Sequence, residues 1–157
     1  MTNDKKQTYT LRISSANRTE LVEILYEMLL DYVEDATKAI SEDNRNDIRE
    51  AIRKCRGCLR ELTDSVNEQN ELCGNFLSLY AYVNKELTFA EIKKDNTRLE
   101  NVRTVILPLK TTYEELSKQD ESESIMSNTQ KVVAGYTYSK NNINETLADQ
   151  NNRGFYV

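Results

Sequence analysis

The feature that most constrains the fold is a long amphipathic segment between Thr19 and Ile40. Its apolar residues recur at the three- and four-residue spacing of an α-helix and cover nearly half of the circumference, and acidic residues occupy the rest. These apolar residues are Leu21, Val22, Leu25, Met28, Leu29, Tyr32, Val33, Ala36, Ala39 and Ile40. A membrane-spanning helix needs about 20 unbroken apolar residues, and the acidic residues interrupt this segment. The segment therefore predicts a partly buried helix that packs against several neighbours.

Three further segments repeat this helical spacing, at about 46–70, 71–94 and 95–116. Four Gly and one Pro in 157 residues suit long helices and leave few turn residues for an all-β fold. Asn17 and Glu20 have the spacing of a capping box, which places the start of the first long helix. Four such helices joined by short polar connections predict an all-α fold, an antiparallel four-helix bundle.

We expect the bundle to occupy residues 17–118, with an additional segment on either side. The polar segment 1–16 carries Tyr9, Leu11 and Ile13 in alternation, and we expect it to lie extended against the bundle.

Residues 119–157 form a charged linker followed by a long, partly ordered C-terminal tail rich in Asn and Tyr. Val132, Val133 and Tyr136 could act as a short apolar ligand tethered beside a groove on the bundle. The alternative is a tail that becomes ordered only with a partner.

The composition gives little support for catalysis or metal binding. The chain has no histidine, and Cys55 and Cys58 lie in a helical pattern without a second pair that could complete a zinc site. We interpret both thiols as core residues, and we expect no cofactor, no metal and no enzymatic activity. The net charge of −5 argues against a nucleic-acid partner. Without a leader-like or membrane-spanning segment, we expect a cytoplasmic protein with no membrane insertion and with reduced thiols.

The aromatic residues leave two interpretations open. Tyr26, Tyr80, Tyr82 and Tyr113 lie at or beside the apolar stripes of the predicted helices. Each could close the core with its hydroxyl at the surface, or together they could form an apolar platform with a polar rim for a partner.

Several features occur in an order typical of one known family. Tyr9 precedes the run RTELVEILYEML, with Leu25 and Tyr26, and the run LSLYAYVNKEL and the acidic turn KKDNTRLENV follow. In order, spacing and length, residues 9–116 resemble the FliS family of flagellin export chaperones. The family usually has Ser-Pro where this chain has Asn17-Arg18, and an Asn cap can replace that start.

The resemblance implies a chaperone that binds the disordered C-terminal segment of flagellin and delays polymerisation until secretion by the flagellar apparatus. The ligand would fold onto an apolar groove formed by the second, third and fourth predicted helices. Tyr9 would act as a gate over that groove, and Leu25 and Tyr26 would be shared between core and groove. The residues implied to bind the partner are Tyr9, Leu25, Tyr26, Leu72, Phe76, Leu79, Tyr80, Tyr82 and Val83.

Two alternatives to flagellin binding follow from the sequence. One is a chaperone or adaptor for another flagellar or coiled-coil partner, since an apolar groove does not name its ligand. The other is a small helical enzyme, which would need a deep polar pocket. An exposed groove would also favour weak self-association into a homo-oligomer.

Overall fold

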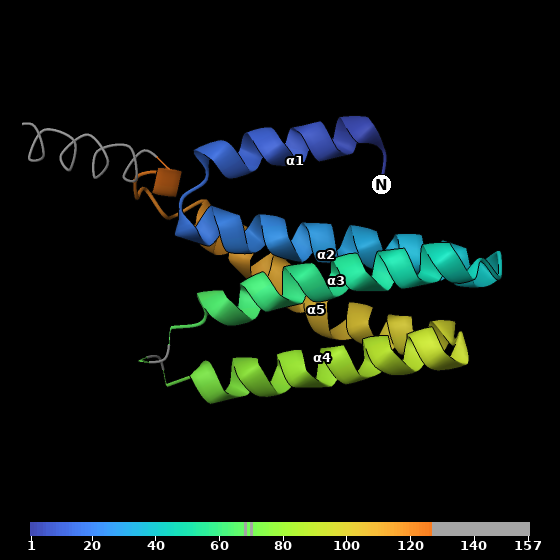
Figure 1. The fold of residues 1–157 in the computed structure, drawn as a ribbon. Coiled ribbons are helices and arrows are strands. Elements are labelled where there is room, and N and C mark those ends of the chain that lie inside the picture. Colours follow the sequence, from blue (N-terminus) through green and yellow to red (C-terminus); the bar gives the residue numbers. More distant parts are fainter. Residues whose placement is uncertain (68, 70, 127–157) are drawn as a thin grey trace, which may run out of the picture.

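The structure is a computed structural model that describes residues 1–67, 69 and 71–126. The described residues form α1 (Asn3–Ser15), α2 (Arg18–Ser41), α3 (Arg45–Ser65), α4 (Cys73–Lys93) and α5 (Asn96–Ser117). Helices α2 to α5 make the predicted all-α bundle, and α1 lies outside it along α2 (Figure 1). The suggested tail ligand at Val132, Val133 and Tyr136 lies outside the described residues.

Helix α2 is the central element of the bundle, as the amphipathic segment predicted. It packs against α3 and α5 on its apolar side and against α1 on the opposite side (Figure 1). Its start matches the sequence prediction, because the Asn17 side chain accepts a hydrogen bond from the Glu20 amide and the Glu20 side chain accepts one from the Asn17 amide. This capping box satisfies two backbone donors that would otherwise lack a partner.

The core lies where α2, α3, α4 and α5 meet. Its largest fully buried side chains include Tyr26, Leu29, Ile52, Leu62, Leu87, Leu99 and Ile106. Cys55 and Cys58 are buried in the same cluster, which confirms their interpretation as core residues. Burial raises the pKa of the Cys58 thiol to about 11 and also raises that of Cys55, so both thiols stay protonated at neutral pH.

The junction between α3 and α4 differs from the prediction. Helix α3 ends at Ser65 instead of near residue 70, with the backbone of Val66 already extended. Asn67 and Gln69 are exposed, so a further helical turn would bury little apolar surface to offset the cost of ordering it. At the next junction, the Asp95 side chain caps α5 by accepting a hydrogen bond from the Thr97 amide.

The predicted extended conformation of residues 1–16 is wrong, because this segment forms helix α1. The alternation of Tyr9, Leu11 and Ile13 suggested a strand period, but the observed burial has a helical period. Tyr9 is buried and Ile13 half-buried, whereas Leu11 is 71% exposed. Residues four apart share a helix face, and the Thr2 side chain caps the first turn.

The segment after α5 turns back to the junction of α1 and α2. The Asn17 side-chain amide donates to the Asp120 carbonyl oxygen (3.1 Å), and the Thr19 hydroxyl donates to the Asp120 carboxylate (2.5 Å). The Ile125 amide donates to the carbonyl oxygen of Ala16 (3.1 Å). Both ends of the described bundle therefore meet at the start of α2.

No helix within the described ranges is both long and apolar enough to cross a membrane.

Candidate partner-binding surface

Four aromatic side chains gather at the end of the bundle where α2 and α4 begin. The hydroxyl oxygens of Tyr26 and Tyr80 are 2.5 Å apart, in a buried hydrogen bond between α2 and α4. The ring centroids of Tyr26 and Tyr113 are 5.5 Å apart, and those of Phe76 and Tyr80 are 6.2 Å apart. These tilted pairs join α2, α4 and α5 into one aromatic cluster.

The electrostatics of this cluster favour neutral side chains. Burial raises the pKa of Tyr26, Tyr80 and Tyr113 above the ordinary value of a phenol. The two buried hydroxyls of Tyr26 and Tyr80 satisfy each other, and Phe76 and Tyr113 are only half-buried. The cluster thus offers an apolar surface at the end of the bundle without an ionised group in it.

A hollow opens beside the exposed edges of Phe76 and Tyr113. It encloses about 300 Å³, the lower end of the ~300–1,000 Å³ range of small-molecule pockets, which is enough for one or two side chains. Its walls come from four helices and from the chain following α3. The lining residues are Arg18, Thr19, Val22, Ser65, Val66, Asn67, Phe76 and Tyr113.

A second hollow follows the seam between α3 and α4, and Tyr80 lies on its wall. This hollow is mixed in character, because both apolar side chains and two arginines line it. Its lining residues are Arg56, Leu59, Arg60, Thr63, Leu77, Tyr80, Ala81 and Asn84. Because the Tyr80 hydroxyl reaches the aromatic cluster, the two hollows adjoin the same packed group of side chains.

The predicted binding residues on α4 divide between the surface and the core. Leu72, at the start of α4, is 53% exposed, Tyr82 is 42% exposed and Leu79 is 36% exposed, so all three are available to a partner. Tyr80 and Val83 are buried and face the bundle interior. The same is true of two further predicted residues, Leu25 and Tyr26 on α2.

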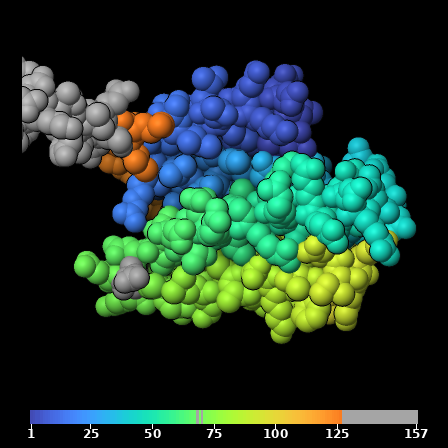
Figure 2. All heavy atoms as spheres, in the orientation of Figure 1, coloured from blue at the N-terminus to red at the C-terminus, as the bar shows by residue number. Residues whose placement is uncertain are grey.

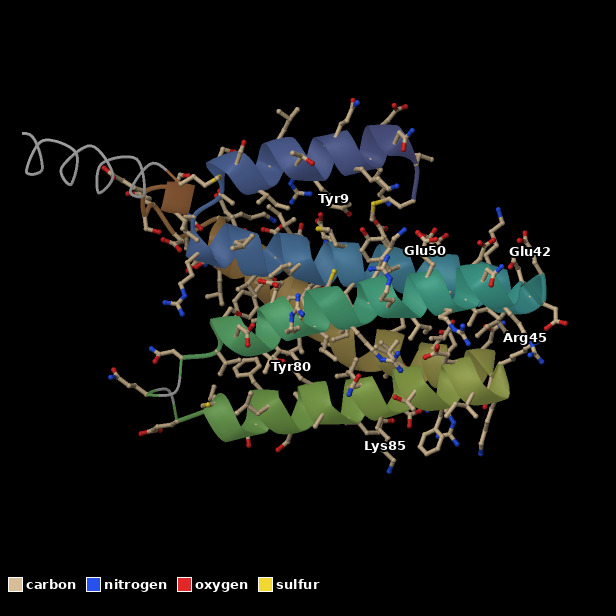
Figure 3. All side chains as sticks on the ribbon, in the orientation of Figure 1. Tyr9, Glu42, Arg45, Glu50, Tyr80 and Lys85 are labelled. Carbon is tan, nitrogen blue, oxygen red and sulfur yellow. The ribbon has the colours of Figure 1, made fainter. Side chains whose placement is uncertain are left out.

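Tyr9 lies apart from these residues, on the inner face of α1. It is buried against α2, and its hydroxyl donates to the Asp31 carboxylate at 2.7 Å. Figure 3 shows Tyr9 between α1 and α2 and Tyr80 between α3 and α4, on the other side of the central helix. Tyr9 therefore covers a separate apolar patch, a small cluster with Ala16 and Ile24.

The sequence did not identify the polar residues that line the two hollows. Arg18, Arg56 and Arg60 lie at their walls, but in the sequence these arginines look like ordinary charged residues on solvated helix faces. The position of Tyr113 at a stripe edge was the sequence observation that pointed to the first hollow, which Tyr113 lines.

The arrangement is that of a helical binding protein. Its hollows are open and lined by both apolar and polar side chains, and no group of three or more metal-ligating residues occurs in the part of the chain that the structure describes. The family model of the flagellar protein FliS matches residues 1–120. A relative in Bacillus subtilis (strain 168), the flagellar secretion chaperone FliS, is 23% identical over 111 residues, covering 71% of this chain and 84% of the relative. The chain belongs to the FliS family of flagellar proteins and is a FliS-like chaperone.

Proposed function

We propose that this chaperone binds the disordered C-terminal segment of flagellin in the cytoplasm and prevents its polymerisation before secretion. The observation that carries the proposal is the aromatic cluster with its adjoining hollows, beside exposed leucines at the start of α4. Family membership, and the description of the Bacillus subtilis relative as a flagellar secretion chaperone, support the same proposed function.

The exposed apolar side chains near the start of α4 give the physical basis for binding. Leu72, Leu77 and Leu79 are exposed by 53%, 41% and 36%, and Phe76 between them is half-buried. A disordered ligand that folds as an amphipathic helix can place apolar residues on this surface and in both hollows. Because folding on binding costs about 2–5 kcal/mol, the ligand must bury an extended surface, and single contacts would not suffice.

Tyr9 enters the proposal as a gate, over α2 instead of over the α3–α4 seam. Helix α1 covers Ile24 on α2. Ion pairs at the edge of this contact, Lys5 with Asp31 and Arg12 with Glu27, also hold α1 against α2. Partly exposed ion pairs of this kind contribute only about 0–1 kcal/mol each. The hydrogen bond from Tyr9 to Asp31 contributes more, about 1.5–3 kcal/mol, so a ligand helix that displaces α1 must offset this bond by burying the apolar patch beneath Tyr9.

Calorimetric titration with a peptide of the last ~40 residues of the host's flagellin tests the proposal. We expect one-to-one binding with a strongly negative heat-capacity change, because apolar burial has that signature. If the flagellin peptide does not bind but a different flagellar export substrate does, that substrate is the partner and the flagellin assignment is wrong.

A surface variant locates the site without disturbing the core. Full burial of a leucine stabilises by about 1.5–3 kcal/mol, and the exposed fractions of Leu72 and Leu79 leave roughly 2 kcal/mol in total to be gained on binding. Leu72→Asp with Leu79→Asp should therefore raise Kd roughly 30-fold. The matched control is Leu107→Asp with Leu116→Asp on α5, because both leucines are exposed, by 48% and 45%, and lie outside both hollows; it should leave Kd unchanged. Equal affinities of the two variants would contradict the proposed location.

A further inference from the structure

Helix α4 has apolar residues on two opposite sides. Its inner side buries Tyr80, Val83, Leu87 and Ala90 against the rest of the bundle. Its other side carries the outer stripe, which we define as Tyr82, Lys85, Phe89, Ile92 and Lys93, at helical spacing. Helix α4 packs mainly on α3 and α5, touches α2 through the Tyr26–Tyr80 hydrogen bond, and forms one edge of the molecule in Figure 2. An edge helix is expected to be polar on its solvent side, so this second apolar side needs an explanation.

The outer stripe combines exposed apolar groups with two lysines, of which Lys85 is near enough to add to the Asn101 hydrogen bond in lowering the pKa of the Glu86 carboxyl. Ile92 is 72% exposed, and the half-buried ring of Phe89 has the Lys85 and Lys93 ammonium groups 5.9 and 5.5 Å from its centroid. Neither lysine forms an ion pair with a carboxylate of the described chain. Figure 3 shows Lys85 pointing away from the bundle.

A third cation near Phe89 is already neutralised. The Arg98 guanidinium lies 5.5 Å from the Phe89 centroid and pairs with Glu86 at 3.3 Å and with Asp95 at 3.7 Å. Glu86 is buried, and it also accepts a hydrogen bond from Asn101 at 2.8 Å. Arg98 thus fixes the base of the stripe, and the two lysines provide its remaining positive charge.

This stripe contrasts with the charge of the whole protein. The chain carries a net charge of −5, yet the five side chains of the stripe include two lysines and no acid. Two copies packed on this stripe about a twofold axis would bring four lysines together, and the repulsion would oppose that pairing. An acidic helix with its own apolar residues would match both the charge and the exposed surface.

We propose that the outer stripe of α4 docks an acidic amphipathic helix of a second partner protein, distinct from the export substrate. The partner's apolar side chains would cover Ile92 and Phe89, and its carboxylates would pair with Lys85 and Lys93. Tyr82 lies at the middle of the helix, where the two surfaces meet. The stripe residues Lys85, Phe89, Ile92 and Lys93 lie in the C-terminal half of α4, whereas Phe76 and the exposed leucines near it lie at the N-terminal end. Both surfaces could therefore be occupied at once, and this proposal does not depend on flagellin being the substrate.

A designed peptide pair tests the proposal directly. The probe is a fluorescent helical peptide of three heptads with leucines on one face and glutamates beside them, and its match has every glutamate replaced by lysine. Fluorescence anisotropy with the full-length protein should show binding of the acidic peptide and at least tenfold weaker binding of the basic one. Raising the salt from about 0.1 to 0.5 M should weaken the first complex, because free ions screen the lysine charges.

Charge reversal on the protein gives the decisive comparison. Lys85→Glu with Lys93→Glu should weaken acidic-peptide binding about tenfold and strengthen basic-peptide binding. The matched control, Lys6→Glu with Lys38→Glu, makes the same net change at exposed lysines of α1 and α2 and should change neither affinity. Equal loss in both double variants would show only a net-charge effect and overturn the assignment.

Two further outcomes would also overturn the proposal. If the acidic peptide and the flagellin peptide compete for the protein, the outer stripe belongs to the substrate surface. If Ile92→Asp turns an oligomer into a monomer in light scattering, the stripe is a contact between copies of this chain. Flagellin binding that fails in the wild type while acidic-peptide binding persists would refute the proposed substrate alone.

Discussion

The hydrogen bond between Tyr26 and Tyr80 gives a stability prediction with an internal control. Tyr26 is 0% exposed and Tyr80 is 4% exposed, and their hydroxyl oxygens are 2.5 Å apart. Replacing either tyrosine by phenylalanine removes one hydroxyl and leaves the other buried without its partner. An unsatisfied buried polar group costs about 1–3 kcal/mol, so each single variant should lose that much free energy of unfolding.

The double variant should behave differently from the sum of the two. With both hydroxyls removed no polar group is left unpaired, and the loss should be close to that of one single variant or smaller. The expected coupling between Tyr26→Phe and Tyr80→Phe is therefore at least about 1 kcal/mol, well above the scatter of additive changes. Equilibrium urea unfolding of the four proteins measures each term. Additive losses, or single variants as stable as the wild type, would refute the buried pair.

The remaining predictions concern α1, alkaline pH and self-association. Tyr9→Phe removes the hydrogen bond to Asp31, and a bond to a charged group contributes about 1.5–3 kcal/mol. Hydrogen exchange of the α1 amides should therefore become at least about tenfold faster while exchange in α3 is unchanged, and unchanged α1 exchange would contradict this. Burial raises the pKa of Tyr26, Tyr80 and Tyr113 from their ordinary 10.0, so these phenols ionise more readily in the unfolded chain. The phenols' contribution to stability should then be complete below about pH 10 and be lost above it, and a melting temperature that does not fall between pH 9 and pH 11 would exclude that linkage. The exposed leucines beside the hollows should give weak self-association that the flagellin peptide reverses, and a concentration-independent monomer mass in light scattering would contradict this.

The bundle itself could be predicted from local patterns. The apolar period of α2 and the Asn17–Glu20 spacing determine where that helix begins and which face it buries, because both are properties of neighbouring residues. Helix α1 could not be assigned in this way. In a short polar segment, the same few apolar residues fit both the alternation of a strand and the spacing of a helix. Packing against α2 determines which structure forms.

The candidate site was harder to predict than the fold. Aromatic residues at stripe edges indicated Tyr80 and Tyr113, and the family resemblance indicated Phe76. The hollows themselves depend on how α3 and α4 are rotated against each other. Rotation depends on packing between residues distant in sequence, such as Arg56 of α3 with Glu91 and Thr88 of α4. For the same reason the sequence could not show that Tyr9 packs on α2, away from the α3–α4 seam.

The hydrogen bonds at the start of α2 have a mechanical consequence. Ala16 is the residue at which α1 turns into α2, and its carbonyl oxygen holds the amide of Ile125. The next residue, Asn17, starts α2 and also holds Asp120. Rotation of α1 about Ala16 would move the carbonyl oxygen that accepts the hydrogen bond from the Ile125 amide. Movement of α1 and movement of the segment after α5 are therefore coupled at this residue. A force on the segment after α5 would therefore act directly on the connection between α1 and α2.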